Sequence, residues 1–186
     1  MSVPAPAHIG LVDEISVRLG EGQLSEFEIA MYIKKADALM NVSPEVAHCA
    51  LGILACLSND EKRAREHHKI AIKLSSQPCF LFNYACSLSY LKHYEEALSY
   101  FLQAVEKAPD VPRHLNLAIK LAFELDSPAL ERLLTLWAKL NKGEDHPARY
   151  EVESRALTRM CTDMSSASLD EVWGGEEESA AWAHLQ

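Results

Sequence analysis

Apolar residues along most of this chain recur every three or four positions, and this spacing constrains the fold more than any other feature. The clearest stretches are 29–40, 51–57, 88–105, 117–125 and 130–140. Such an interval places the apolar side chains on one side of an α-helix, whereas a half-buried strand would alternate polar and apolar residues. No stretch alternates in that way, so the sequence predicts an all-α fold.

Prolines divide the helical pattern into blocks, and short polar breaks divide the blocks again. The prolines are Pro44, Pro78, Pro109, Pro112, Pro128 and Pro147. Proline suits the first turn of a helix because it has no backbone N–H to be satisfied there. The breaks fall at 20–23, 58–60, 92–93 and 126–127. Loops this short make consecutive helices antiparallel, so we expect hairpins of about 33 to 35 residues.

The hairpins repeat in sequence as well as in length. Shifting the chain by 33 residues places Ala64 on Ala97 and Ala71 on Ala104. Small residues that recur at the repeat spacing indicate positions where two helices approach closely. A period of this size predicts a stack of antiparallel hairpins, that is, a helical solenoid.

The block from Pro78 to Val111 resembles a tetratricopeptide (TPR) repeat. Its small and large residues match the family's pattern at Leu81, Ala85, Leu88, Tyr94, Ala97, Phe101, Ala104 and Pro109. The preceding block is degenerate, since it has His68 at the aromatic position and Glu61 where tyrosine is usual. The outer blocks match the family by period and hairpin shape only. A helical bundle without repeats is the alternative fold.

Two segments are expected after the last hairpin. Residues 8–164 should form the TPR-like domain, closed by a capping helix with Tyr150, Val152, Leu157 and Met160 on its apolar side, because the last hairpin of an array needs a cover. Residues 165–186 are rich in serine, glycine and acidic residues and are expected to form a flexible acidic tail. Within the tail, Trp182 and Leu185 have helical spacing and offer a route to homo-oligomers or to docking in the chain's own groove.

The resemblance implies a binding surface, because stacked TPR hairpins form a concave groove lined by the first helix of each hairpin. Carrying the repeat register along the chain implies these groove residues: Val46, Cys49, Ile53, Phe82, Cys86, Arg113, Asn116 and Lys120. The cationic clamp that some TPR proteins use to hold a carboxylate is missing, since only Asn83 and Arg113 are of suitable type. A groove that is apolar at one end and basic at the other suits an apolar peptide or an amphipathic helix.

Charge and hydropathy exclude several classes of partner. The formal net charge is −9 and the pI is about 5.3, which disfavours nucleic acid, because nucleic acid requires clustered basic residues. The segment "MSVPAPAHIG" lacks the basic and apolar regions of a signal peptide. No stretch approaches the roughly 18 apolar residues of a membrane span. We therefore expect a cytoplasmic protein that binds neither nucleic acid nor membrane.

No motif predicts catalysis, a cofactor or a metal. The chain has an odd number of cysteines, five, and reduced thiols fit this better than a disulfide framework. Cys49 and Cys56 are two helical turns apart, about 10 Å by helix rise, which is too far for one ion. The histidines at 67, 68, 93 and 114 lack metal-ligand spacing and are expected on helix surfaces or in loops.

The function that follows is a non-enzymatic protein-binding module, an adaptor or a chaperone, which holds an apolar peptide or helix of a partner protein. A narrower alternative is a small TPR-type chaperone of a bacterial secretion system, since these are similar in size and acidity. Alternatives from other classes are a metal-dependent helical regulator or enzyme, and a structural subunit that is buried in a permanent oligomer.

Overall fold

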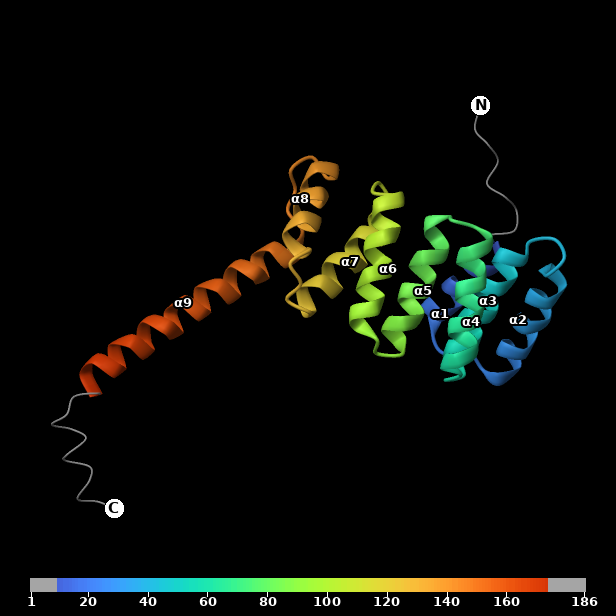
Figure 1. Ribbon diagram of the computed structural model, residues 1–186, viewed down its shortest axis with the longest axis horizontal. Coiled ribbons are helices and arrows are strands. Elements are labelled where there is room, and N and C mark those ends of the chain that lie inside the picture. Colours follow the sequence, from blue (N-terminus) through green and yellow to red (C-terminus); the bar gives the residue numbers. More distant parts are fainter. Residues whose placement is uncertain (1–9, 174–186) are drawn as a thin grey trace, which may run out of the picture. The chain divides into compact units, whose positions relative to one another are not determined.

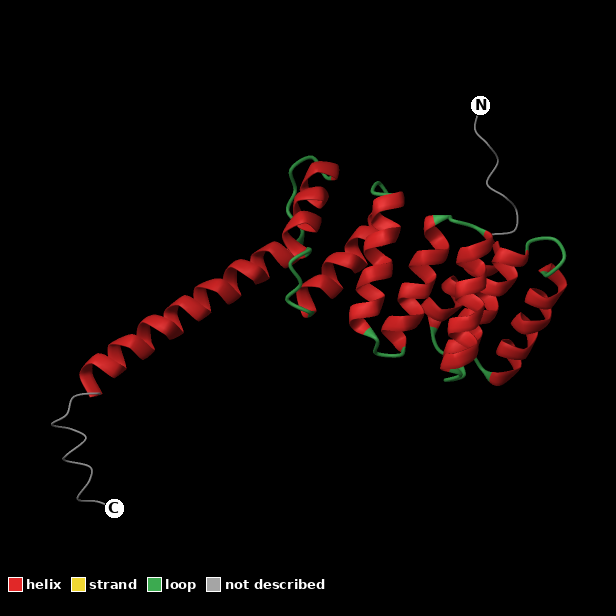
Figure 2. Ribbon diagram, in the orientation of Figure 1, coloured by secondary structure: helices red, strands yellow, loops and turns green. Residues whose placement is uncertain are grey.

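The computed structural model describes residues 10–173 of the 186-residue chain, with side chains described as far as Thr162. Every regular element in residues 10–173 is an α-helix, as Figure 2 shows, so the predicted all-α class is confirmed. The helices are α1 (Gly10–Glu21), α2 (Glu26–Leu39), α3 (Pro44–Leu57), α4 (Glu61–Leu74), α5 (Pro78–Tyr90), α6 (Tyr94–Lys107), α7 (Pro112–Glu124), α8 (Leu130–Leu140) and α9 (Pro147–Trp173).

The chain divides into two compact units, Met1–Leu136 and Trp137–Gln186, and the boundary falls inside α8. In the first unit, α3 packs along α4 and α5 packs along α6 as two antiparallel hairpins (Figure 1). The second helix of one hairpin also packs on the first helix of the next, as α2 does on α3 and α6 does on α7. The expected stack of hairpins is therefore present.

Helix starts follow the predicted punctuation. Proline occupies the first turn of α3, α5 and α7, and α9 begins at Pro147. The start of α2 is instead a capping box, in which the Ser25 hydroxyl accepts from the Glu28 N–H at 3.3 Å and the Glu28 carboxylate accepts from the Ser25 N–H at 2.8 Å. Both arrangements remove unsatisfied N–H groups at a helix start.

The turns inside the hairpins share one conformation. Asn59, Lys92 and Asp126 have positive φ values of 57°, 66° and 47°, and they recur at intervals of 33 and 34 residues. After each of them, the next backbone N–H reaches back to the helix carbonyl five residues earlier, for example from His93 to Leu88 at 2.9 Å. This is the Schellman arrangement that ends a helix. The repeat therefore extends to the backbone of three successive turns.

Small residues lie between the helices, as the repeat predicts. Ala64, Ala71, Ala97 and Ala104 are each at most 1% exposed. A larger side chain at these positions would force apart two helices that are packed at interior density.

His68 departs from the expectation that the histidines lie at the surface. Its side chain is fully buried, stacks on Tyr84 with ring centroids 5.1 Å apart, and has Nε2 2.9 Å from the Ser87 hydroxyl. Gly52 faces this ring, and a Cβ added to Gly52 would lie 2.7 Å from His68 Cδ2. The histidine therefore fills the position of the family's aromatic residue, and a glycine opposite provides its space.

Two more histidines connect the helices of one hairpin, and a fourth is buried elsewhere. Nδ1 of His48 on α3 lies 2.8 Å from Nδ1 of His67 on α4, with ring centroids 5.1 Å apart. The two nitrogens face each other, so one ring must donate a proton and the other must be neutral to accept it. His114 is only 8% exposed, which also corrects its expected place at the surface.

The second unit contains the end of α8, a loop and α9. In the loop, His146 meets Trp137 edge-on with ring centroids 4.8 Å apart, and its Nδ1 accepts from the Ala148 N–H at 3.1 Å. Helix α9 continues to Trp173 and so includes residues 165–173. The flexible acidic tail expected over residues 165–186 stays a prediction.

The apolar side chains expected on the capping helix are on α9. Three of them, Tyr150, Leu157 and Met160, are more than half exposed, and the capping role stays a prediction. The predictions for Trp182 and Leu185 concern residues outside the part of the chain that the structure describes.

Gly52→Ala should destabilise the protein, although alanine ordinarily stabilises a helix relative to glycine by about 0.5–1 kcal/mol. The added methyl group would overlap the His68 ring, and overpacking of this kind costs about 1–3 kcal/mol. Urea unfolding measures the difference. Gly20→Ala is the matched control, because nothing lies within 4 Å of a Cβ added there. Equal stabilisation by both substitutions would contradict this packing.

Stability should fall as the pH is lowered from about 7.5 to about 5. Burial lowers the pKa of His48, His67, His68 and His114, that of His68 to about 3. Below the ordinary histidine pKa of about 6.5, the unfolded chain therefore binds more protons than the folded chain, and acid favours unfolding. His68 alone should account for about 2 kcal/mol by pH 5.

Urea midpoints across this pH range test the expectation. The stability contributed by the neutral histidines is fully present above pH of about 6.5 and is lost as the pH falls toward each folded-state pKa. His68→Gln should reduce the slope of stability against pH. A stability that is constant or that rises on acidification would show that these rings are protonated in the folded protein.

Candidate functional site

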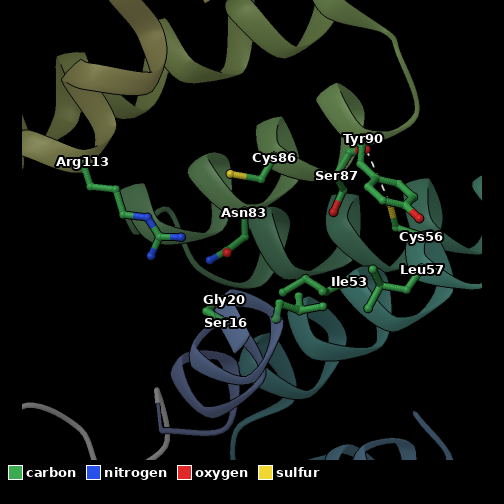
Figure 3. Close-up of a pocket in the computed structure, with 11 residues that line it drawn as sticks. Ser16, Gly20, Ile53, Cys56, Leu57, Asn83, Cys86, Ser87, Tyr90 and Arg113 are labelled. Atoms are coloured by element: carbon green, nitrogen blue, oxygen red, sulfur yellow. Dashed lines mark hydrogen bonds between the residues drawn. The ribbon is translucent and has the colours of Figure 1, made fainter. Parts of the chain in front are cut away.

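A pocket of about 340 Å³ opens in the first unit beside α1, between α3, α5 and the start of α7 (Figure 3). We call it the α1 pocket. It is lined by Ser16, Leu19, Gly20, Ile53, Cys56, Leu57, Asn83, Cys86, Ser87, Tyr90 and Arg113. Pockets that bind ligands typically have volumes of about 300–1,000 Å³, apolar walls and a few polar groups. The α1 pocket fits this description.

A second depression of about 550 Å³ lies next to the α1 pocket and shares Leu19, Leu57 and Tyr90 with it. Its other lining residues come from the α1–α2 loop and from α2, and they are Gly22, Gln23, Leu24 and Ile29. The Tyr90 side chain between the two is 56% exposed. Together the depressions offer a mainly apolar surface along the C-terminal half of α1.

The structure brings three of the predicted groove residues together. Ile53, Cys86 and Arg113 come from the first helices of three successive hairpins, α3, α5 and α7, and all line the α1 pocket. Asn116 and Lys120 lie further along α7 and are not among the residues that line it. Asn116 is half-buried and Lys120 is exposed.

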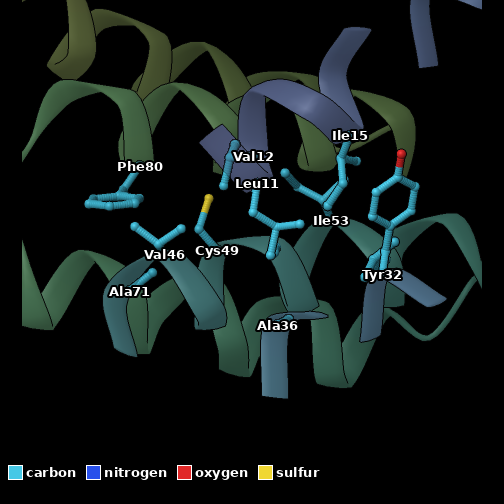
Figure 4. Packing of buried hydrophobic residues seen from close by; sticks show 12 residues of the cluster. Leu11, Val12, Ile15, Tyr32, Ala36, Val46, Cys49, Ile53, Ala71 and Phe80 are labelled. Atoms are coloured by element: carbon cyan, nitrogen blue, oxygen red, sulfur yellow. The ribbon is translucent and has the colours of Figure 1, made fainter. Parts of the chain in front are cut away.

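The other three predicted groove residues are buried, so the prediction that a partner can reach their side chains is wrong. Val46, Cys49 and Phe82 are no more than 3% exposed. Figure 4 shows Val12 and Leu11 of α1 beside Cys49 and Val46 of α3, in one apolar cluster. Helix α1 therefore covers the part of α3 that the repeat register marks as open.

Hydrophobic packing holds α1 in this place more than its ion pairs do. Ile15 of α1 is completely buried. Burial of one such side chain stabilises the folded state by about 1.5–3 kcal/mol. Arg18 pairs with Glu28 and Lys35 pairs with Glu14, each at 2.7 Å. These pairs are partly exposed, and exposed pairs contribute about 0–1 kcal/mol.

Phe82 is covered from the other side by the start of α7. Its ring stacks on His114 with centroids 4.4 Å apart, and the Arg113 guanidinium lies 5.1 Å from the Phe82 centroid. Phe82 therefore does not line the pocket, but it supports Arg113, which does.

The two thiols in the pocket are not activated. Burial raises the pKa of Cys56 and of Cys86 to about 11, so both stay protonated near neutral pH, and a thiol is a poor nucleophile in that form. Cys56 donates to the Ser87 carbonyl at 3.4 Å. In the part of the chain that the structure describes, no group of three or more His, Cys, Asp or Glu side chains could hold a metal ion.

Sequence reasoning missed the wall that α1 contributes to the pocket, through Ser16, Leu19 and Gly20. It also missed Tyr90 and Leu57, which are the last residues of α5 and α3. Their position at helix ends that face α1 is set by the packing of α1, for which the repeat pattern gives no signal. Among the described helices, none is long and apolar enough to cross a membrane.

Comparison with known proteins agrees with the hairpin at α5 and α6. A family model described as "Tetratricopeptide repeat" matches residues 78–111. A solved structure described as "Functional Characterization of Pseudomonas Aeruginosa pilF" is similar over 95% of this chain and 100% of that chain, with 18% identity and a TM-score of 0.49. No curated protein matches the chain. Residues 78–111 are thus a tetratricopeptide repeat, set in an all-helical stack of hairpins.

Proposed function

We propose that this protein is a non-enzymatic protein-binding module, an adaptor or a chaperone, and that the α1 pocket receives an apolar side chain of its partner's peptide or helix. The observation that carries the proposal is the meeting of Ile53, Cys86 and Arg113 in one open pocket. These residues come from three successive hairpins, so a ligand there would contact the inner side of the stack.

The shape of the pocket favours a side chain that inserts from a larger partner. Leu19, Ile53 and Leu57 form apolar walls, and the neighbouring depression extends the apolar surface beyond Tyr90. Binding energy at protein interfaces is concentrated in a few apolar or aromatic anchors that fill such pockets. A helix or an extended segment could place one anchor in each depression.

The proposal also revises the predicted contact residues. Ile53, Cys86 and Arg113 remain in the site, and Asn116 and Lys120 would extend its basic edge along α7. Val46 and Cys49 are buried against α1, so a partner would contact α1 instead of these two residues.

Filling the α1 pocket with a large side chain should prevent the partner from binding. Cys86→Trp places a large ring among the lining residues, and we expect the protein captured from a lysate of the source cells to be lost from this variant. Ser99→Trp is the matched control, because Ser99 is exposed on α6, away from the pocket. Helical circular dichroism and melting temperature check that both variants fold.

Quantitative mass spectrometry of the captured proteins decides between the outcomes. The proposal expects at least one protein to be retained by the wild type and by Ser99→Trp and to be absent from Cys86→Trp. An identical set of proteins on all three would place binding elsewhere. Capture of nothing by the wild type would argue against a binding module.

A further inference from the structure

We propose that His48 and His67 form a binding site for a divalent transition-metal ion such as Zn²⁺, separate from the α1 pocket. The two imidazoles come from the two helices of one hairpin, α3 and α4, and their Nδ1 atoms are 2.8 Å apart. An ion bound by both nitrogens would join α3 to α4. Neither ring is among the residues that line the α1 pocket, so the metal site does not depend on the proposed protein-binding function.

The distance between the two nitrogens is close to the distance that one metal ion requires. Zinc binds histidine nitrogen at about 2.0–2.1 Å. Two such bonds that meet at about 90–110° place the nitrogens about 2.8–3.4 Å apart. The observed 2.8 Å lies at the short end of this range. A small rotation of each ring therefore admits an ion, and the last torsion of a histidine side chain permits such a rotation because its energy wells are broad.

Both rings have the chemistry of a metal ligand. A histidine nitrogen binds a metal only when it carries a lone pair, that is, on a neutral ring. Burial lowers the pKa of His48 and of His67, so both rings are neutral near pH 7. On binding, the proton shared by the two Nδ1 atoms leaves, and the ring that donated it takes up a proton from solvent on Nε2. Both rings then stay neutral and offer Nδ1 to the ion.

The charges around the pair favour a cation on balance. Arg63 adds to the lowering of the His67 pKa by burial, whereas Glu66 on α4 and Asp37 on α2 oppose that lowering. Two carboxylates thus act on the site against one guanidinium. Both histidines are only half-buried, so water can reach the ion. Because the described residues contain no group of three or more metal-binding side chains, water would complete the coordination.

The other histidines of the described helices and loops use their ring nitrogens differently. Nε2 of His68 lies 2.9 Å from the Ser87 hydroxyl, and Nε2 of His93 lies 2.9 Å from the Glu61 carboxylate. His48 and His67 instead face each other. Imidazole suits zinc, copper and nickel. Zinc is the appropriate probe, because copper would oxidise the free thiols of this chain.

Titration calorimetry with zinc chloride, on the full chain cleared of metal with EDTA, tests the proposal. The wild type should bind a single zinc ion. His48→Gln and His67→Gln should each weaken binding at least about tenfold, since the loss of even an outer partner of a metal ligand costs this much. His93→Gln is the matched control and should bind zinc as the wild type does. Absence of binding, or equal losses in all three variants, would overturn the proposal.

Nitrogen NMR on the wild type identifies the binding atoms without any substitution in the site. In two-bond ¹H–¹⁵N spectra, zinc should shift the Nδ1 signals of two rings and leave both Nε2 atoms protonated. The two glutamine variants assign these signals, because each variant lacks one of them. Zinc shifts confined to Nε2 atoms, or to rings other than His48 and His67, would place the ion elsewhere and overturn the proposal.

The melting temperature reports whether the ion joins the two helices. An ion that binds the folded chain stabilises it, so zinc should raise the melting temperature of the wild type and of His93→Gln. Each glutamine variant also loses the hydrogen bond between the rings, and for this reason each variant is compared with itself, with and without zinc. Circular dichroism checks that it folds. A rise of equal size in His48→Gln and His67→Gln would contradict the proposed site.

Discussion

The close approach of helices at small buried residues is the constraint on which the rest of this structure depends. Ala64, Ala71, Ala97 and Ala104 let the helices of each hairpin touch along their lengths, and Gly52 gives the same room to the buried His68 ring. Because these positions recur with the repeat, each hairpin adds to the last with a similar geometry. The first helices of successive hairpins therefore line up, and this alignment brings α3, α5 and α7 to one pocket.

The repeat leaves an apolar surface on those first helices, and the chain covers part of it. Helix α1 takes the surface above Val46 and Cys49 and buries Ile15 there. Next to α1 the surface stays open, with Arg113 at one edge. Helix α1 thus covers part of the apolar face, and the α1 pocket stays open beside it.

Features encoded locally could be predicted from the sequence, and those created by tertiary packing could not. Helices, their proline starts and the hairpin breaks follow from periodicity and turn chemistry, as at Pro78 and Lys92. The pocket residues Ile53, Cys86 and Arg113 followed from the repeat register. The burial of Val46 and Cys49 depends on α1, and that of Phe82 depends on His114 and Arg113. These contacts join residues that are distant in sequence, so no local pattern predicts them. The surface position predicted for His68 is wrong, because the sequence around a histidine does not distinguish a stacked ring in the core from a ring at the surface.

The central claim is that a partner segment enters the α1 pocket, and the alkylation rate of Cys86 tests it most directly. Cys86 lines the pocket and is partly exposed, whereas Cys79 lies on the same helix and does not line it. Mass spectrometry can follow both thiols with and without a bound partner. The account predicts that binding slows the alkylation of Cys86 and leaves that of Cys79 unchanged. An unchanged rate at Cys86 in a saturated complex would contradict it.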